Sequence, residues 1–404
     1  MANQLLTIQM ITNEALAVLV NELSFTRGVN RQYDDSFAVK GAKIGDTLNV
    51  RKPPRYIGRT GQAVSIEDSV ETSVPVVLTT QRGVDMQFSS ADYALRIDDF
   101  SDRFLKPAMA NVANAIDFDG LTLASNATYN AVGTIGTAPT QKTVLQAGAL
   151  LDINATPVGS NLRSMVIDPT TQVEVVNTLS TLFNNSGKIS KQYDTGRMGV
   201  GVLGFNWDMD QNVQIHTTGP LGGTPLVNGA AQTGSTLVTD GWTAAAALRL
   251  NKGDRFTIAG VYTVNPQSRA ITKNLQQFTV TANVSSDGTG AASIPISPAI
   301  TPTGQFQNVS ASPADNAAIT VLGTAGQQYT VNIGHHRDAF TLACADLPLP
   351  KGVHEAARKS DPQTGLSVRM VTDYNVSTDQ FITRLDILYG WAALYPEWST
   401  AMVY

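Results

Sequence analysis

One long helical pattern, from Asp98 to Ser125, constrains the fold more than any other stretch of the chain. Its apolar residues recur every three to four positions, so one face of a helix would carry a continuous apolar stripe. Asp98, Asp99 and Asp102 precede the stripe and suit the positive end of a helix. The stripe consists of Phe100, Phe104, Leu105, Ala108, Met109, Val112 and Ile116.

Pro107 lies inside this pattern, and proline lacks the N–H that the interior of a helix requires. We therefore expect either a kink at Pro107 or a helix that begins near Lys106 after a short lead-in turn. An ordinary core helix is the plainest interpretation of the stretch. The three acids could also suggest a divalent-cation site, but capping and the helix dipole explain them better.

The composition is that of a globular protein with few charges. The chain has 404 residues, enough for two or three domains, and 42% of them are hydrophobic. Only 15% are charged, against about 25% in an average protein, which favours a surface that partners cover. The net charge of -5 argues against a protein that wraps nucleic acid.

Cysteine and the N-terminus indicate a protein made in a cytoplasm. The single cysteine, Cys344, excludes a disulfide framework within the chain, and its apolar neighbours predict a buried, inert thiol. The first basic residue is Arg27, so we expect no signal peptide. The longest aliphatic run nearby, residues 15–20, is too short to cross a bilayer.

An alternating apolar pattern predicts a long hairpin between residues 44 and 88. Seven apolar residues from Val70 to Phe88 share one parity over 19 positions, far more than a typical strand of about 5–6 residues. Such a hairpin needs cover from outside its own domain. Prolines and glycines predict turns at its tip, Arg51 to Ser69. The tip also holds four cations, for which a solvated basic loop is the plainest interpretation: Arg51, Lys52, Arg55 and Arg59.

Other local patterns predict shorter elements. A capping box at Ser89 to Asp92 predicts a helical turn, and residues 185–206 are expected to form a mobile loop. Two runs of opposite parity, joined by a turn at 377–380, predict a second long hairpin near the C-terminus. Helices are expected at 12–25, 141–154 and 170–183, and strands at 162–168, 329–333 and 339–345.

The composition shifts at about residue 217, where the chain becomes rich in Gly, Thr and Pro. Short strands separated by turns follow, and the SSDGTG sequence at 285–290 is a hairpin signal. Together they predict a small all-β barrel or sandwich inserted into a larger domain. The strands are expected within 248–266, 277–296 and 317–323.

No catalytic or metal-binding constellation is visible in the sequence. The four histidines lack HExxH spacing, and His335 and His336 would point to opposite faces of a strand. Nucleophile-elbow and phosphate-loop motifs are missing as well. We therefore expect a protein that is not an enzyme and needs neither cofactor nor metal.

The order of these elements resembles that of major capsid proteins of tailed bacteriophages, which have the α+β Hong Kong 97-like fold. Within that group the chain is similar to coat proteins of short-tailed phages that carry a β-barrel insertion domain. ITNEALAVLVNEL resembles their N-terminal helix, GDTLNVRKPPRY the start of their extended loop, and DDFSDRFLKPAMANVANAIDFD their spine helix. NKGDRFTIAGVYTVNP and NVSASPADNAAITVLG resemble the first and last motifs of the insertion domain, and HRDAFTLACADLPLP the strand after it.

The resemblance implies a division of the chain into an N-terminal arm, peripheral and axial domains, and an insertion domain. The peripheral domain would contain the extended loop, about 44–88, and the spine helix, about 98–125. The implied parts are the arm and helix at 1–30, the peripheral domain at 31–128, the axial domain at 129–216 and 329–365, the all-β insertion domain at 217–328, and a C-terminal hairpin and tail at 366–404.

The resemblance also implies self-assembly into an icosahedral shell of hexamers and pentamers around double-stranded DNA. Such a protein is assembled in the bacterial cytoplasm and resides in the virion. Its implied partners are further copies of itself, portal and scaffolding proteins and a decoration protein, with no membrane and no sequence-specific contact to DNA. We hypothesise that the four tip cations meet Asp98, Asp99 and Asp102 of a neighbouring subunit, each exposed pair contributing about 0.2–1 kcal/mol.

Two other functions are compatible with parts of the sequence. An encapsulin-type compartment shell has the same fold, but such shells generally lack the insertion domain. A β-rich binding or adhesion protein could be built on residues 217–325, although the long helix and the two long hairpins argue against it.

Overall fold

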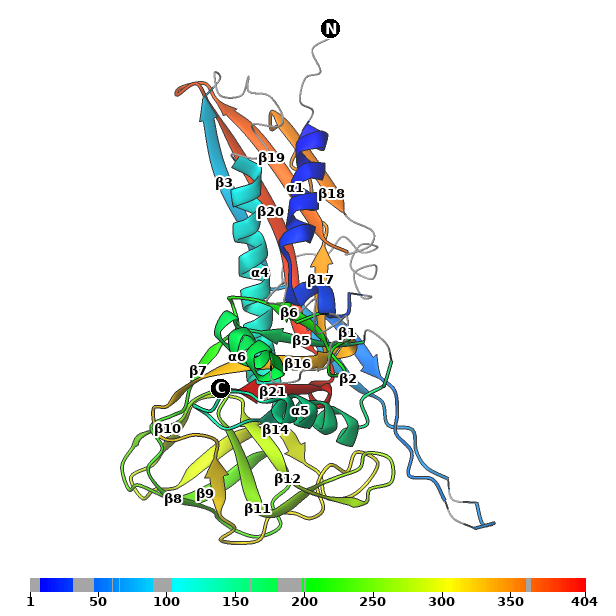
Figure 1. Ribbon diagram of the computed structural model, residues 1–404. Coiled ribbons are helices and arrows are strands. Elements are labelled where there is room, and N and C mark those ends of the chain that lie inside the picture. Colours follow the sequence, from blue (N-terminus) through cyan, green and yellow to red (C-terminus); the bar gives the residue numbers. More distant parts are fainter. Residues whose placement is uncertain are drawn as a thin grey trace. The chain divides into compact units, whose positions relative to one another are not determined.

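The computed structural model describes residues 8–31, 47–59, 61–64, 66–89, 104–159, 162–180, 198–199, 201–360 and 365–404 (Figure 1). Within these ranges the chain forms two compact units. The first unit takes its residues from 1–51, 73–120 and 340–394. The second takes them from 52–72, 121–339 and 395–404.

The first unit is built on a five-stranded antiparallel sheet with β20 in its interior. Strand β20 pairs with β3 along Gln380–Tyr389 and with β17 along Leu388–Ala393. Strands β19 and β20 form the long C-terminal hairpin that the alternating pattern predicts. The strands are β3 (Thr80–Ser89), β17 (Phe340–Ala345), β18 (Glu355–Ser360), β19 (Ser367–Asn375) and β20 (Gln380–Ala393).

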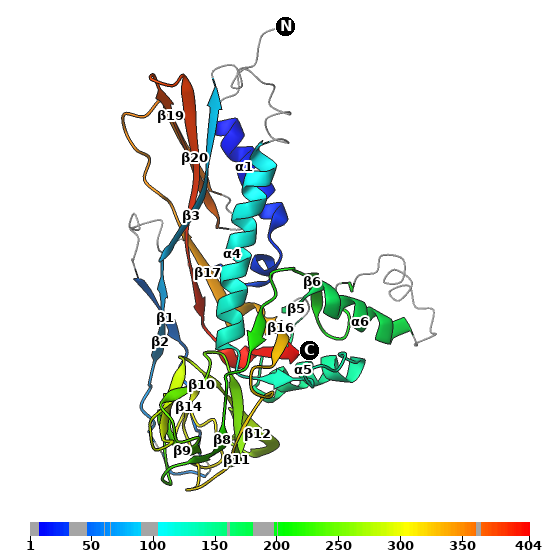
Figure 2. The same cartoon turned by 90° about the vertical axis from the view of Figure 1, so that its left-hand side faces the viewer.

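Two helices run along this sheet in Figures 1 and 2. Helix α1 (Ile8–Glu22) contacts β18 and β19, and the 3-10 turn η1 (Phe25–Gly28) follows it. Helix α4 (Lys106–Ala127) begins after the π-helical residues Phe104 and Leu105, so Pro107 lies in its first turn. Of the two outcomes expected at Pro107, the start of α4 at Lys106 agrees with the second, and the residues immediately before Phe104 lie outside the described part of the chain.

The apolar stripe of α4 is buried, as its spacing predicts. Leu105, Met109, Val112 and Ile116 are all shielded from solvent. Asp98, Asp99 and Asp102 lie outside the described residues, as do Phe100, most of the predicted helical turn at Ser89 to Asp92 and most of the expected loop at 185–206. The helix predicted over 98–125 is thus confirmed from Lys106 onward.

The strand expected between Val70 and Phe88 is in fact two strands that belong to different sheets. Strand β2 (Thr72–Val77) pairs with β1 (Thr47–Lys52), whereas β3 pairs with β20. The chain changes partner close to Gly390 of β20. The two backbones are so near here that a Cβ atom on residue 390 would lie only 2.0 Å from the Val77 carbonyl oxygen. Apolar alternation continues through this junction because Val76 and Leu78 are both buried, so periodicity alone does not reveal the break.

Part of the second unit is a mixed sheet covered by helices. Its strand order is β4-β21-β16-β5-β6, and β7 also pairs with β16. Helices α5 (Gln141–Ile153) and α6 (Pro169–Ser180) confirm two predicted helices, and α5 helps to bury a core around Met165 and Phe205. The strands are β4 (Ala131–Val132), β5 (Arg163–Ile167), β6 (Asn206–Met209), β7 (Ile215–Thr217), β16 (Gln328–His336) and β21 (Ser399–Val403).

The predicted β-barrel is present between β7 and β16. Six strands pair in the order β15-β11-β12-β14-β9-β8, and a bridge between Leu226 and Ala318 joins the two ends of the sheet. Phe256 and Phe278 stack inside it, with ring centroids 5.7 Å apart. Its strands are β8 (Gly223–Val227), β9 (Gly234–Trp242), β11 (Arg255–Val264), β12 (Ile271–Val280), β14 (Ala292–Ile300) and β15 (Ile319–Val321).

The SSDGTG sequence forms a turn but not a two-stranded hairpin. The Asp287 carboxylate accepts hydrogen bonds from the backbone N–H groups of Thr289 and Ala291, which closes the turn. Strand β13 (Val284–Ser286), before the turn, pairs with β10 (Ala247–Leu250), whereas β14 after it belongs to the barrel. The predicted turn is confirmed. The expected pairing of the two flanking strands is wrong, because β13 pairs with β10 and β14 pairs with β9 instead.

Two further observations concern burial and membranes. Cys344 is buried in β17 and forms no disulfide, as the sequence predicts. Among the helices that the structure describes, none has the length and apolar character needed to cross a membrane.

Candidate functional site at the root of the extended hairpin

Lys52, Arg55 and Arg59, three cations singled out in the sequence, have contacts within their own chain that can be described in detail. The guanidinium of Arg55 lies 3.3 Å from an Oε1 of Glu397, and the ammonium of Lys52 lies 4.7 Å from the centre of the Tyr395 ring. Arg59 donates to the backbone carbonyls of Gly61 and Ala63 within the tip. Arg51 is exposed at the end of β1. Asp98, Asp99 and Asp102, their proposed partners, lie outside the described residues.

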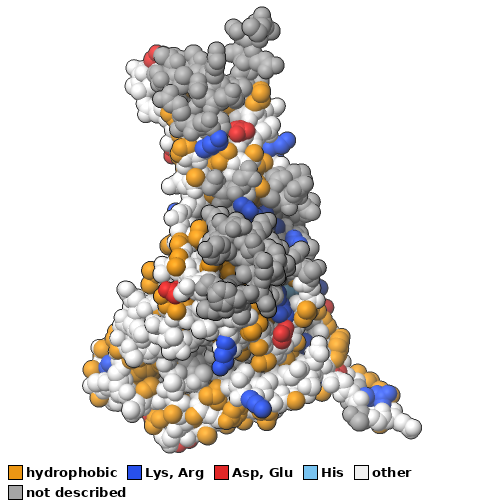
Figure 3. Space-filling model, viewed as in Figure 1, with side chains coloured by type: hydrophobic (Ala, Val, Ile, Leu, Met, Phe, Trp, Pro, Cys, Tyr) orange, Lys and Arg blue, Asp and Glu red, His pale blue; other side chains and the backbone are white. Residues whose placement is uncertain are grey.

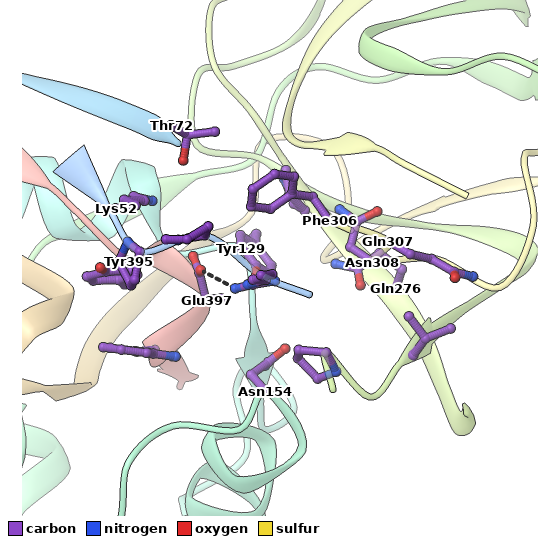
Figure 4. Close-up of a pocket in the computed structure, with 17 residues that line it drawn as sticks. Lys52, Thr72, Tyr129, Asn154, Gln276, Phe306, Gln307, Asn308, Tyr395 and Glu397 are labelled. Carbon is purple, nitrogen blue, oxygen red and sulfur yellow. Dashed lines mark hydrogen bonds and ion pairs between the residues drawn. The ribbon is translucent and has the colours of Figure 1, made fainter. Parts of the chain in front are cut away.

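Lys52 and Arg55 line a cavity of about 270 Å³, shown in Figure 4. In this view Lys52, Tyr395 and Glu397 lie on one side, and Phe306, Gln307 and Asn308 from the barrel lie on the other. The guanidinium of Arg55 is 5.9 Å from the centre of the Phe306 ring. The root of the hairpin is therefore enclosed by the C-terminal segment and by a barrel loop.

Burial governs the electrostatics of this cavity. It lowers the pKa of Lys52, an effect that the carboxylate of Glu397 opposes and the charge of Arg55 reinforces. Burial also raises the pKa of Tyr129 well above its usual range, and Glu397 raises it further. The cavity thus holds a poorly hydrated cation and a neutral phenol beside one ion pair. The contacts of Lys52 and Arg55 hold the root of the hairpin against the C-terminal segment.

The C-terminal segment that the cations contact is itself held by ring contacts and a hydrogen bond. The rings of Tyr395 and Trp398 stack at 4.2 Å, and Trp398 meets the edge of the His336 ring at 5.3 Å. The side-chain amide of Asn130 donates to the Ser399 carbonyl at 3.0 Å. Glu397 and Tyr395 were not predicted because Glu397 lies 342 positions from Arg55 and Tyr395 lies 343 positions from Lys52, and no local pattern links the two segments.

The tip of the hairpin carries exposed apolar side chains that sequence analysis also missed. Ile57, Val64 and Ile66 are 50%, 80% and 90% exposed. Figure 3 shows hydrophobic side chains beside cations on this hairpin. The signal that could have identified two of them is the alternation of Val64 and Ile66 along the sequence.

The adjacent histidines have no ligand-binding arrangement. Both His335 and His336 are buried on β16, and burial lowers the pKa of His335 to about 4 and lowers that of His336 as well. Within the part of the chain that the structure describes, no three His, Cys, Asp or Glu side chains are grouped so that they could hold a metal ion.

Comparison with known proteins gives one match over almost the whole chain. The family model described as P22 coat protein, gene protein 5, matches residues 1–402. A search of curated proteins finds no match.

Solved structures give weaker similarities. A chain from Mycobacterium phage Che8 has a TM-score of 0.47 at 10% identity, with coverage of 94% of this chain and 90% of that one. The capsid of Ralstonia phage GP4 has a TM-score of 0.43 at 7% identity, covering 95% and 91%. The CUS-3 coat protein I-domain is 27% identical over 27% of this chain and 94% of its own, with a TM-score of 0.17.

Proposed function

The chain belongs to the P22 coat protein family and builds a phage capsid shell, and we propose that the apolar tip of its extended hairpin joins each subunit to a neighbouring copy. The observation that supports this is the exposure of Ile57, Val64 and Ile66 at the end of a hairpin whose root is held within its own chain. A second copy of the chain is the natural occupant because a shell is built from repeated contacts between identical subunits.

Magnitudes favour the apolar side chains over the cations as the source of affinity. Burying one exposed Val or Ile side chain contributes about 1.5–3 kcal/mol. An exposed ion pair contributes only about 0–1 kcal/mol. Lys52 and Arg55 would also have to leave Tyr395 and Glu397 before they could pair with a neighbour. We therefore assign affinity to the tip's apolar residues.

The four cations of the hairpin keep a secondary role in this proposal. Arg51, Lys52, Arg55 and Arg59 would set the register of the contact with Asp98, Asp99 and Asp102 of the neighbour. The exposed guanidinium of Arg59 bonds only to carbonyls of its own tip among the contacts described, so it can turn to a carboxylate with little rearrangement.

Other parts of the proposal concern partners and domains. Double-stranded DNA would be enclosed without specific binding, as the net charge of -5 favours. Portal, scaffolding and decoration proteins are further proposed partners, and we propose no catalytic role. Residues 217–328 would form the insertion domain, which is supported by the closed barrel and by its own core of buried side chains around Phe256 and Phe278. Family membership favours this function over a compartment shell or an adhesion protein.

The double variant Val64→Ser/Ile66→Ser tests the apolar tip. We expect it to fold normally and to need a higher subunit concentration for assembly, as sedimentation would measure. Val158→Ser is a matched control because Val158 is 84% exposed and lies outside the hairpin. Shells that form from the double variant at the wild-type concentration would contradict the proposal.

A further inference from the structure

Two loops of the barrel contact the extended hairpin between its root, at Lys52 and Arg55, and its exposed apolar residues, one loop on each arm. The guanidinium of Arg269 donates to the carbonyl oxygen of Tyr56 at 3.1 Å. The side-chain amide of Gln305 donates to the carbonyl oxygen of Asp68 at 2.6 Å. Both acceptors are backbone atoms, so these two contacts depend on the backbone conformation of the hairpin and not on the identity of its side chains.

Arg269 is presented by a turn that is fixed independently of the hairpin. The Asn265 carboxamide oxygen accepts from the backbone N–H groups of Gln267 and Ser268, at 2.9 and 3.0 Å. The Arg269 N–H donates to the Asn265 carbonyl at 2.8 Å, and Arg269 has a φ of 57°, which closes the turn. The barrel therefore offers a preorganised side chain to the hairpin.

The guanidinium of Arg269 links three separate segments. Besides Tyr56, it donates to the carbonyls of Gln267 at 3.0 Å and of Gly304 and Gln305 at 3.4 Å. These contacts use several N–H groups of one planar fork, which the single ammonium of a lysine does not reproduce. Arg269 thus joins the β11–β12 turn, the loop that carries Gln305 and one arm of the hairpin.

The two arms are also tied to each other at this level. The Tyr56 hydroxyl donates to the Ser69 Oγ at 3.3 Å, and the Ile57 N–H donates to the Glu67 carboxylate at 2.7 Å. Because the arms are linked, fixing Tyr56 and Asp68 fixes the direction in which the tip leaves the barrel. Val64 and Ile66 lie beyond this level and stay exposed.

We propose that the barrel is the mount of the extended hairpin and that Arg269 and Gln305 are its positioning residues. The mount orders the hairpin before assembly, so less conformational entropy is lost when the tip meets a neighbour. This role rests on the proposed function of the tip. It gives the inserted barrel a task within its own subunit, namely to set the angle at which the subunit presents its contact surface.

Hydrogen exchange on the full-length, unassembled subunit tests the mount directly. In Arg269→Ala we expect the amide of Ile57 and its neighbours to exchange about tenfold faster than in the wild type, because charged hydrogen bonds that hold the arm are lost. Arg269→Lys should behave like Arg269→Ala, since it keeps the charge and loses the fork. Lys273→Ala is the matched control because it removes an exposed cation from the same barrel.

Gln305→Ala provides a second variant should Arg269→Ala disturb the barrel, and it should speed exchange around Asp68. Unchanged exchange in the hairpin of folded Arg269→Ala and Gln305→Ala subunits would overturn the mount, whatever their assembly. Faster exchange with normal assembly would overturn its role in presenting the tip. Normal assembly of Val64→Ser/Ile66→Ser would instead refute the tip contact and leave the exchange result standing.

Discussion

The guanidinium of Arg255, the first residue of barrel strand β11, donates to the carbonyl oxygen of Ser125 at 2.6 Å, in the last turn of α4. Its Nε also donates to the Thr128 carbonyl at 2.8 Å. A buried cation thus caps the C-terminal end of the long helix, where the helix dipole is negative. The side chain of Arg255 therefore joins the barrel to the backbone at the end of the helix.

Arg255→Met should destabilise the second unit. The substitution keeps an apolar stem but leaves the carbonyls of Ser125 and Thr128 without these donors, at about 1–3 kcal/mol for each unsatisfied buried group. Urea unfolding followed by tryptophan fluorescence would measure the loss. Lys252→Met removes an exposed cation three positions before Arg255 and should leave the urea midpoint equal to that of the wild type within error. Equal midpoints for the two variants would refute the capping role.

Asp117→Ala should loosen the connection between α1 and α4. The Asp117 carboxylate is buried and accepts from the backbone N–H groups of Ser24 and Thr26, at 2.7 and 3.1 Å, and from both of their hydroxyls. Its loss leaves buried donors unpaired, so we expect the free energy of unfolding to fall by about 3 kcal/mol or more. Thermal unfolding would detect this change.

The matched control is Asp85→Ala, because Asp85 is an exposed acid in the same unit whose nearest cation, Arg384, is 4.0 Å away. That exposed pair should contribute less than about 1 kcal/mol. A small effect at Asp117, comparable with that at Asp85, would show that the segment after α1 is held by its apolar contacts alone.

Stability should fall as the pH is lowered from 6.5 towards 4, and His335 should contribute to the fall. Burial lowers the pKa of His335 from 6.5 to about 4 in the folded chain, so the unfolded chain binds a proton first. The folded state is therefore favoured most above pH 6.5, and it loses up to about 3 kcal/mol from this group by pH 4.

The measurement is urea unfolding at a series of pH values between 7 and 5, where most carboxylates stay ionised. His335→Gln should flatten the slope of stability against pH. His354→Gln is the control, because His354 lies outside the core and the substitution should leave the slope unchanged. A slope that stays the same in His335→Gln would mean that other groups cause the pH dependence.

The sequence by itself determined most of the local structure. The start of α4 at Lys106 matches one of the two outcomes expected from Pro107, since a proline is tolerated in a first turn and not in a helix interior. The buried stripe of Met109, Val112 and Ile116 followed from their spacing, and the C-terminal hairpin from alternating parity. Such features depend on neighbouring residues, so a sequence pattern contains the information needed to predict them. The order of the elements also allowed the capsid resemblance to be stated.

Only the tertiary structure decided which segments pair. The exchange of partners between β2 and β3, the closure of the barrel at Leu226 and Ala318, and the ion pair of Arg55 with Glu397 join residues far apart in the chain. Each depends on which of several compatible partners buries the most surface at the least cost in chain entropy. A local sequence pattern indicates which side chains will be buried or charged, but it does not identify the distant residues that they contact. The cations at the hairpin root could therefore be predicted from the sequence, whereas their partners could not.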